Sequence, residues 1–342
     1  MVPAPERSRL RFTLRLRSAS SSIGCVLVLV LAWLLHPFPA SADGPVFEDG
    51  DDLTALNSRR VPHKPADWAP LYQRVDKELQ HKLDVEVASH RRWQQLVDQH
   101  RLGLCVVDLN SSPPRFARVN GNEMMYAASL PKIAILLGAY AAFEDGSLEE
   151  KPEYKDDLDQ MIRVSSNDAA TRMIDAVGMR KINATLRDPA FGLYDESRGG
   201  GLWVGKRYAK AGPRVGDPMH GISHGATPTQ VCRFYYLLAT GKLISSERSR
   251  QMLSHLQDPG LHHKFVAELD VLAPNARTYR KSGTWRDFHS DSVLVRGTEW
   301  RNYILVGLVQ ADDGGKLLRE ILRSIEGILQ PTDWEGALPV SG

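Results

Sequence analysis

Strand-like segments occur in two groups that lie far apart in the sequence, and a long helical stretch separates them. The first group has two segments, Leu102 to Leu109 and Arg115 to Val119. The second has three, spaced like consecutive antiparallel strands: Ala276 to Trp285, Asp291 to Val295 and Asn302 to Gln310. A sheet built from both groups leaves the helical stretch as an insertion. The order therefore predicts an α+β fold, an antiparallel sheet flanked by terminal helices with an inserted all-helical domain.

Helices are predicted at both ends of this sheet domain and inside the insertion. The first runs from Asp67, as its cap, to about Gln99, with Leu71, Val75 and Leu79 on one face. The last helix also has one apolar face, made by Leu317, Leu318, Ile321, Leu322, Ile325 and Ile328. The insertion spans about residues 129–241. One helix in it begins at Thr227-Pro228, a cap followed by a first-turn proline, and stops at Gly241.

The N-terminus has the pattern of a cleaved export signal. Five arginines lie among the first 17 residues, an uncharged apolar run follows from Ile23 to Leu35, and Ala40-Ser41-Ala42 provides a small-x-small cleavage site. The apolar run is shorter than the ~20 residues of a membrane-spanning helix, so we prefer cleavage after Ala42 to an uncleaved anchor. We expect a secreted or periplasmic protein with a signal peptide over 1–42, a linker over 43–66, a main domain over 67–332 and a tail over 333–342.

The charge balance argues against a nucleic-acid partner. The chain of 342 residues has 43 basic and 41 acidic side chains, and the first 42 residues hold five of the basic ones and one of the acidic ones. The remainder is slightly acidic, so no basic surplus remains to bind phosphates.

Two cysteines, Cys105 and Cys232, remain after removal of the signal. They could form one disulfide in an oxidising compartment, but sequence alone does not reveal pairing. Cys105 lies in a strand-like run and Cys232 in a helix-like one, and we favour two buried free thiols. No metal-ligand spacing is present, and we expect neither a metal nor a cofactor.

The segment Ser129-Leu130-Pro131-Lys132 combines a nucleophile with a base. Pro131 suits a first helical turn, which puts Ser129 at the helix N-terminus and Lys132 on the same face. A serine hydroxyl needs a base to take its proton, and a partly desolvated lysine can act as a neutral amine. A Ser-x-x-Lys motif alone is weak evidence, because about one is expected by chance in a chain of this length. The ordinary alternative is a capped helix with a surface lysine.

Two further motifs follow in order. Ser165-Ser166-Asn167 lies between an apolar stretch and a new helix, where an ordinary cap is the alternative. Lys281-Ser282-Gly283-Thr284 lies on a predicted strand, where a mid-strand glycine indicates either a bulge or a close approach to the backbone.

The three motifs together resemble the signature of penicillin-recognising serine enzymes, namely class A β-lactamases and penicillin-binding proteins. The resemblance covers about residues 70–330 and extends to the order of strands and helices. Tyr126 to Lys132 and Met161 to Asn167 look most like the class A branch.

The resemblance implies a role for each motif residue. Ser129 would be the nucleophile and Lys132 would help to deprotonate it, while Ser165 would pass a proton to the leaving nitrogen and Lys281 would add positive charge. The substrate would be bound by Asn167, through its side-chain amide, and by Ser282, through its carboxylate. The backbone N–H groups of Ser129 and Thr284 would form the oxyanion hole, and Gly283 would leave room for a substrate lying along the strand.

The chain departs from class A enzymes at the deacylation step. Ser166 replaces an aspartate, a mild change, and the spacing from Ser129 to Ser165 is shorter than usual. The loop glutamate that activates the hydrolytic water in that class is absent before Thr227, where no Glu-x-x-x-Asn occurs. Glu196 lies too far upstream, and Asp217 and His224 remain as possible substitutes.

These features predict an exported, monomeric serine hydrolase of the class A β-lactamase type, acting without metal or cofactor on a small β-lactam or a peptidoglycan peptide. Two alternatives keep the same serine: a D,D-peptidase of the penicillin-binding type, and a sensor module that stays acylated. The missing loop glutamate separates the β-lactamase prediction from these two alternatives.

Overall fold

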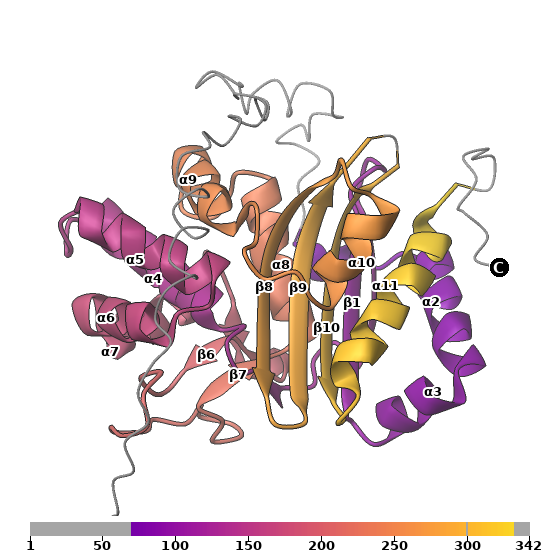
Figure 1. The fold of residues 1–342 in the computed structure, drawn as a ribbon, viewed down its shortest axis with the longest axis horizontal. Helices are drawn as coiled ribbons and strands as arrows, with labels where there is room; N and C mark the ends of the chain where they lie inside the picture. The colour runs from indigo at the N-terminus through magenta and orange to yellow at the C-terminus, as the bar shows by residue number, and fades with distance from the viewer. Residues whose placement is uncertain (1–69, 299, 332–342) are drawn as a thin grey trace, which may run out of the picture. The chain divides into compact units, whose positions relative to one another are not determined.

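The computed structural model describes residues 70–298 and 300–331, and the predicted signal peptide, linker and tail lie outside them. The two groups of strands form one antiparallel sheet in the order β2-β1-β10-β9-β8 (Figure 1). Its strands are β1 (Leu102–Asp108), β2 (Arg115–Val119), β8 (Arg277–Trp285), β9 (Phe288–Arg296) and β10 (Asn302–Gln310). The predicted α+β fold is confirmed, and β8 is an edge strand of the sheet.

Terminal helices cover one face of the sheet. α2 (Lys77–Ser89), α3 (Arg91–Asp98), α10 (Phe265–Leu272) and α11 (Gly314–Leu329) share an apolar core with alternate residues of β1, such as Leu104 and Val106. The intervening residues Cys105 and Val107 point to the opposite face and join a second core with α8 (Pro228–Ala239). The period-two alternation of a strand thus supplies both cores.

The predicted helix from Asp67 to Gln99 is wrong in its start and its continuity. Asp67 lies outside the described residues, and α2 begins ten residues later, where Leu79 N donates a hydrogen bond of 2.8 Å to the Asp76 carboxylate. His90 then separates α2 from α3.

Pairing with β2 explains the late start. Phe116 N donates to Arg74 O at 2.8 Å, and Asp76 N donates to Phe116 O at 2.9 Å. These bonds hold the segment around Val75 extended, and Val75 itself is 48% exposed. A contact 41 positions away in sequence therefore overrides the local helical pattern.

The inserted region is mainly helical. It contains α4 (Lys132–Glu144), α5 (Pro152–Arg163), α6 (Asn167–Val177), α7 (Met179–Arg187) and α8, and α9 (Ser246–Leu256) follows. α4 is apolar on nearly all sides and is buried among the other helices, as expected of such a helix. α8 begins as predicted, with the Thr227 hydroxyl accepting a hydrogen bond from Gln230 N.

Short strands and turns complete this region. Those belonging to small sheets are β3 (Met125–Tyr126), β4 (Tyr194–Asp195), β5 (Gly200–Gly201), β6 (Trp203–Val204) and β7 (His224–Ala226). A 3-10 turn at Glu196–Arg198 lies in this region, and another, Leu71–Gln73, precedes α2. β3 pairs with β7, which brings the chain before α4 next to the segment before α8.

Cys105 and Cys232 form a disulfide, so the prediction of free thiols is wrong. The bond joins β1 to α8, whose packing against the inner face of the sheet brings the two Cα atoms to 6.4 Å. This separation lies within the range that a disulfide spans. The two residues are 127 positions apart, and only the tertiary fold brings them together.

Among the described helices, none is long and apolar enough to cross a membrane.

Candidate active site

Ser129 lies in a turn between β3 and α4. Three groups outside the turn hold its backbone: the Ser290 hydroxyl donates to Ala127 O at 2.8 Å, the Tyr208 hydroxyl donates to Ala128 O at 3.0 Å, and His224 O accepts from Ala127 N at 2.8 Å. Ala128 has a φ of 51°, a left-handed conformation that these contacts stabilise. The Ser129 hydroxyl itself makes no hydrogen bond to another described residue, so the nucleophile is held by its backbone.

Lys132 is the first residue of α4 and is fully buried. Its ammonium donates to Ser165 O at 2.6 Å, to Asn167 Oδ1 at 2.8 Å and to the Ser165 hydroxyl at 3.3 Å. Burial lowers the pKa of Lys132 to about 7, because desolvation penalises the charged form. A substantial fraction of Lys132 is therefore neutral near pH 7 and able to accept a proton.

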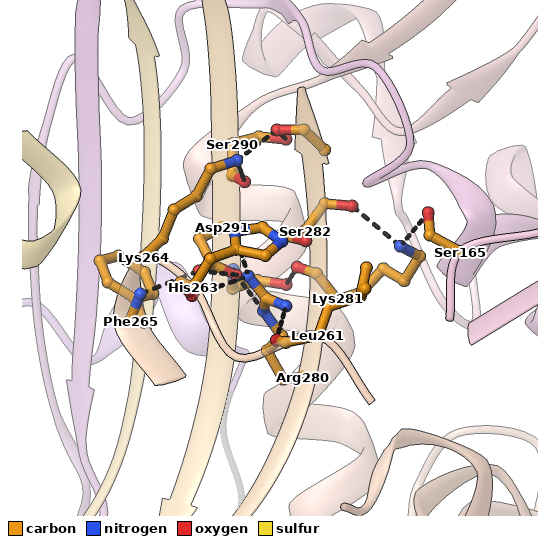
Figure 2. Close-up of polar contacts among 12 residues, drawn as sticks. Ser165, Leu261, His263, Lys264, Phe265, Arg280, Lys281, Ser282, Ser290 and Asp291 are labelled. Atoms are coloured by element: carbon orange, nitrogen blue, oxygen red, sulfur yellow. Dashed lines mark hydrogen bonds and ion pairs between the residues drawn. The ribbon is translucent and has the colours of Figure 1, made fainter. Parts of the chain in front are cut away.

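Ser165 connects the two lysines of the site. It lies between α5 and α6 with a φ of 61°, and Ser166 caps α6 by accepting from Ala169 N. The Ser165 hydroxyl accepts from Lys281 Nζ at 2.9 Å, and Figure 2 shows the two side chains directed toward each other. The hydroxyl thus contacts both lysines, which is the arrangement that a proton relay requires.

Lys281 is buried in the middle of β8. Besides Ser165, its ammonium contacts Ser282 O at 2.8 Å. Burial lowers the pKa of Lys281 well below its usual range, and the nearby positive charge of Lys132 lowers it further.

The strand beyond Lys281 lies against the turn that carries Ser129. A Cβ atom on Gly283 would lie 2.6 Å from Ser129 N and closer still to Ala127 O, so only glycine fits there. Glycine is therefore required at position 283 for a reason other than the one expected. The turn that carries Ser129 occupies the space that was assigned to the substrate. Ser282 is buried beside it, and Thr284 is exposed.

An aromatic pair lies on the opposite side of Lys132. The Tyr208 ring stacks on His224 with centroids 4.3 Å apart and planes 1° apart, and Lys132 Nζ lies 4.6 Å from the Tyr208 centroid. Burial lowers the pKa of His224 to about 4, and the charge of Lys132 contributes, so the imidazole is neutral at pH 7. An aromatic ring therefore contacts the lysine from the loop where a glutamate was sought.

Asp217, the carboxylate considered as a substitute, and Glu196, set aside as too far upstream, both have structural partners elsewhere. Asp217 accepts from the Tyr194 hydroxyl and from three backbone N–H groups of its own loop, those of Met219, His220 and Ile222. Glu196 pairs with Arg187. Within residues 70–298 and 300–331, no carboxylate hydrogen-bonds to Lys132 or Ser165. Of the possible substitutes, only His224 lies next to the site.

Sequence reasoning missed Lys264, Tyr208 and a buried ion pair between Arg280 and Asp291. Arg280 Nε donates to Asp291 at 2.7 Å, and both side chains are almost fully buried beneath β8 and β9 (Figure 2). These residues belong to no recognisable motif. Lys264, Arg280 and Asp291 are buried charged residues, and their partners could not be read from the sequence.

The described part of the chain contains no group of three or more His, Cys, Asp and Glu side chains arranged to hold a metal ion.

Solved structures with the same fold include penicillin-interacting proteins and β-lactamases. PBP-A is 18% identical with a TM-score of 0.56, and the match covers 73% of this chain and 95% of that one. A PBP-A mutant solved as an acyl-enzyme complex with penicillin G has the same identity and TM-score, covering 76% and 98%. A β-lactamase from Sphaerobacter thermophilus is 16% identical with a TM-score of 0.55, covering 73% and 98%. At these identities, the matches show the fold.

No curated protein sequence matches the chain. The model of the beta-lactamase enzyme family matches residues 149–327, just over half of the chain. This segment contains Ser165, Asn167 and the strand motif from Lys281 to Thr284, and it begins after Ser129 and Lys132. The chain belongs to the beta-lactamase enzyme family.

Proposed function

We propose that this protein is an exported serine hydrolase that β-lactams, and peptides of the cell-wall stem type, acylate at Ser129, and that it releases the acyl group slowly. The observation that carries the proposal is the set of contacts around Lys132. On one side, Ser165 and Asn167 bind its ammonium, and on the other an aromatic ring covers it. Family and fold support the serine-hydrolase chemistry.

Acylation begins with proton transfer from the Ser129 hydroxyl to neutral Lys132, whose lowered pKa suits a base near pH 7. The Ser129 oxygen then attacks the amide carbonyl, and the carbonyl oxygen becomes an oxyanion. The N–H groups of Ser129 and Thr284 stabilise it. The Ser129 turn lies against Gly283, the residue before Thr284, and Ser129 N donates no backbone hydrogen bond among the described residues, which leaves it available.

Collapse of the tetrahedral intermediate breaks the C–N bond, and the leaving nitrogen takes a proton from the Ser165 hydroxyl. Lys281 and Lys132 contact this hydroxyl and can resupply the proton. Asn167 would hydrogen-bond the substrate's side-chain amide. Lys281 and Ser282 would bind the carboxylate that β-lactams share with the end of a D-Ala-D-Ala peptide, because both lie on β8 beside Ser165 and no carboxylate of the described residues hydrogen-bonds to either side chain.

Deacylation needs a base that activates water. The loop facing Lys132 provides Tyr208 and neutral His224 instead of a carboxylate, and Tyr208 covers the lysine. This favours the two long-lived alternatives, the D,D-peptidase and the acylated sensor, over rapid β-lactam turnover. The acyl-enzyme solved for a PBP-A mutant is a precedent for an adduct on this fold.

The test is a time course of intact mass after mixing the protein with a penicillin and, separately, a cephalosporin. We expect an adduct that persists after free drug is removed, equal to the mass of the whole penicillin, or to that of the cephalosporin less any leaving group at its 3′ position. Ser129→Ala should abolish it entirely, because the nucleophile is lost. Ser254→Ala, which removes an exposed hydroxyl of α9, should label like the wild type.

Each outcome separates one part of the proposal. An adduct that vanishes as drug is consumed would show a β-lactamase with an unrecognised base. Labelling of Ser129→Ala at the wild-type level would refute the assignment of the nucleophile, and no adduct on the wild type would refute acylation by β-lactams.

A further inference from the structure

Lys264 lies immediately before α10 and is almost fully buried. Its ammonium donates three hydrogen bonds: to Gly283 O at 2.6 Å, to the Thr284 hydroxyl at 2.9 Å and to Ser290 O at 3.0 Å. Figure 2 shows it reaching across β9 to these groups. None of these hydrogen-bond partners is a carboxylate, and two of the three are backbone carbonyls of β8 and β9.

The position of Lys264 is maintained against local strain. Its φ is 54°, a conformation that residues with a side chain rarely adopt. Phe265 N donates to Asp291 at 3.1 Å, which ties the start of α10 to the buried Arg280–Asp291 pair. Burial lowers the pKa of Lys264 to about 8, so most of it is protonated at neutral pH. A buried charge on a strained backbone is retained where it serves a site.

The carbonyl of Gly283 and the N–H of Thr284 belong to the same peptide group. In a trans peptide, the two point in opposite directions and share one resonance system. Lys264 binds the carbonyl on the side of β9, so the Thr284 N–H points away from β9, toward the outer edge of β8. The Ser129 turn lies against Gly283, the other residue of this peptide. A cation on the carbonyl draws electron density from the nitrogen and makes the N–H a stronger donor.

Ser290 connects this peptide to the turn that carries the nucleophile. Its hydroxyl donates to Ala127 O, and its carbonyl accepts from Lys264. The two residues therefore join the Gly283–Thr284 peptide and the backbone before Ser129 into one hydrogen-bonded unit.

We propose that Lys264 is a positioning residue for the oxyanion hole: its ammonium fixes and polarises the Gly283–Thr284 peptide, so that the Thr284 N–H becomes a strong donor to the developing oxyanion. This inference rests on the proposed function. It assigns Lys264 no contact with the substrate and no proton transfer.

The first test needs no substrate. In ¹⁵N-labelled protein, Lys264→Met should move the Thr284 amide nitrogen upfield, because the carbonyl of its peptide loses a charged hydrogen bond. Arg319→Met is the matched control. It removes an exposed partner of Glu268 and so loosens the attachment of α10 without touching the peptide, and it should leave the Thr284 resonance in place.

The second test follows acylation. Lys264→Met should slow acylation by a β-lactam about 10-fold, less than the ~10²–10³-fold expected when an oxyanion-hole donor is deleted. The infrared stretch of the acyl-ester carbonyl should move to a higher frequency, because its hydrogen bonds are weaker. Lys264→Arg keeps a charged donor, so it should retain part of the acylation rate and part of the wild-type shift in the carbonyl frequency. If the Met variant does not fold, Lys264→Gln keeps an uncharged donor and should show the same changes to a smaller extent.

The two proposals fail differently. A wild-type protein that no β-lactam acylates refutes the proposed function, and the Thr284 resonance still decides the effect of Lys264. An unmoved Thr284 resonance, or an equal change in Arg319→Met, refutes the role of Lys264 while leaving the serine chemistry intact. A slower acylation with an unchanged carbonyl frequency also refutes it, since only packing would then be affected.

Discussion

The site has two sides whose side chains differ in chemistry. The side formed by β8, with the residue before α10, is polar and cationic, and its lysines donate charged hydrogen bonds to the Ser165 hydroxyl and to backbone carbonyls. The side formed by the loop that ends at β7 is aromatic, with Tyr208 stacked on a neutral His224. Lys132 contacts groups from α5–α6 and the loop at once.

This difference separates the two halves of the proposed reaction. Attack by Ser129 and protonation of the leaving nitrogen need the lysines, the Ser165 hydroxyl and the oxyanion hole. The strand side, the α5–α6 turn, the Ser129 turn and the start of α4 supply these groups, and the loop that ends at β7 supplies none of them. Hydrolysis of the acyl-enzyme needs a base beside the acyl carbonyl, and the loop offers aromatic rings instead. Substitutions on the two sides should therefore change different steps.

Within this comparison, the largest effect is expected at Lys132, which contacts Ser165 and Asn167 as well as the Tyr208 ring of the loop. Lys132→Met should slow acylation by at least ~10²-fold, the usual contribution of a positioned base. The rate is measured by stopped-flow with a chromogenic cephalosporin, and Lys155→Met, an exposed lysine of α5, is the control. Acylation of the Lys132 variant at the wild-type rate would make Lys132 a structural residue and would assign the base to another group.

The pH dependence should show which protonation state of Lys132 acts. A lysine is a base only when neutral, so acylation should accelerate as the pH rises through its pKa of about 7. Between pH 6 and pH 8 the neutral fraction of such a group rises about tenfold, and the rate should follow. A rate that falls over this interval would indicate that the charged form acts, and Lys132→Met should lose the dependence.

Sequence patterns predicted the parts of this molecule that are fixed by local chemistry. β10 has the predicted bounds Asn302–Gln310, and α8 begins at the predicted cap and proline, because alternation and capping act over a few neighbouring residues. The resemblance carried by the three motifs, and not local chemistry, implied that Ser165, Lys132 and Lys281 share one site, and the structure brings their side chains together.

Features that depend on distant partners were not predictable in this way. The start of α2 depends on Phe116, the disulfide depends on the packing of α8 against β1, and Lys264 depends on carbonyls 19 and 26 positions away. The sequence indicated that another group approaches the backbone closely at Gly283. It did not identify that group as the Ser129 turn, which lies far from Gly283 in the sequence. A single sequence contains both residues of each pair, but it does not show which residues contact each other in the fold.

The smallest effect is expected on the aromatic side. Tyr208→Phe keeps the ring that stacks on His224 and covers Lys132, and it removes only the hydrogen bond to Ala128 O. Loss of one such bond should lower the free energy of unfolding by about 1 kcal/mol. Acylation should slow a few-fold, because the Ser129 turn keeps its bonds from Ser290 and to His224.

Urea unfolding and acylation rates of the same samples test this, with Tyr154→Phe as a control for loss of a tyrosine hydroxyl. If the loop side acts only through its rings, persistence of the adduct should be unchanged in Tyr208→Phe. An adduct that clears as slowly as in the wild type would thus assign slow release to the ring itself. Faster clearance would instead show that the hydroxyl excludes the hydrolytic water, and the division between a reactive strand side and a passive loop side would no longer hold.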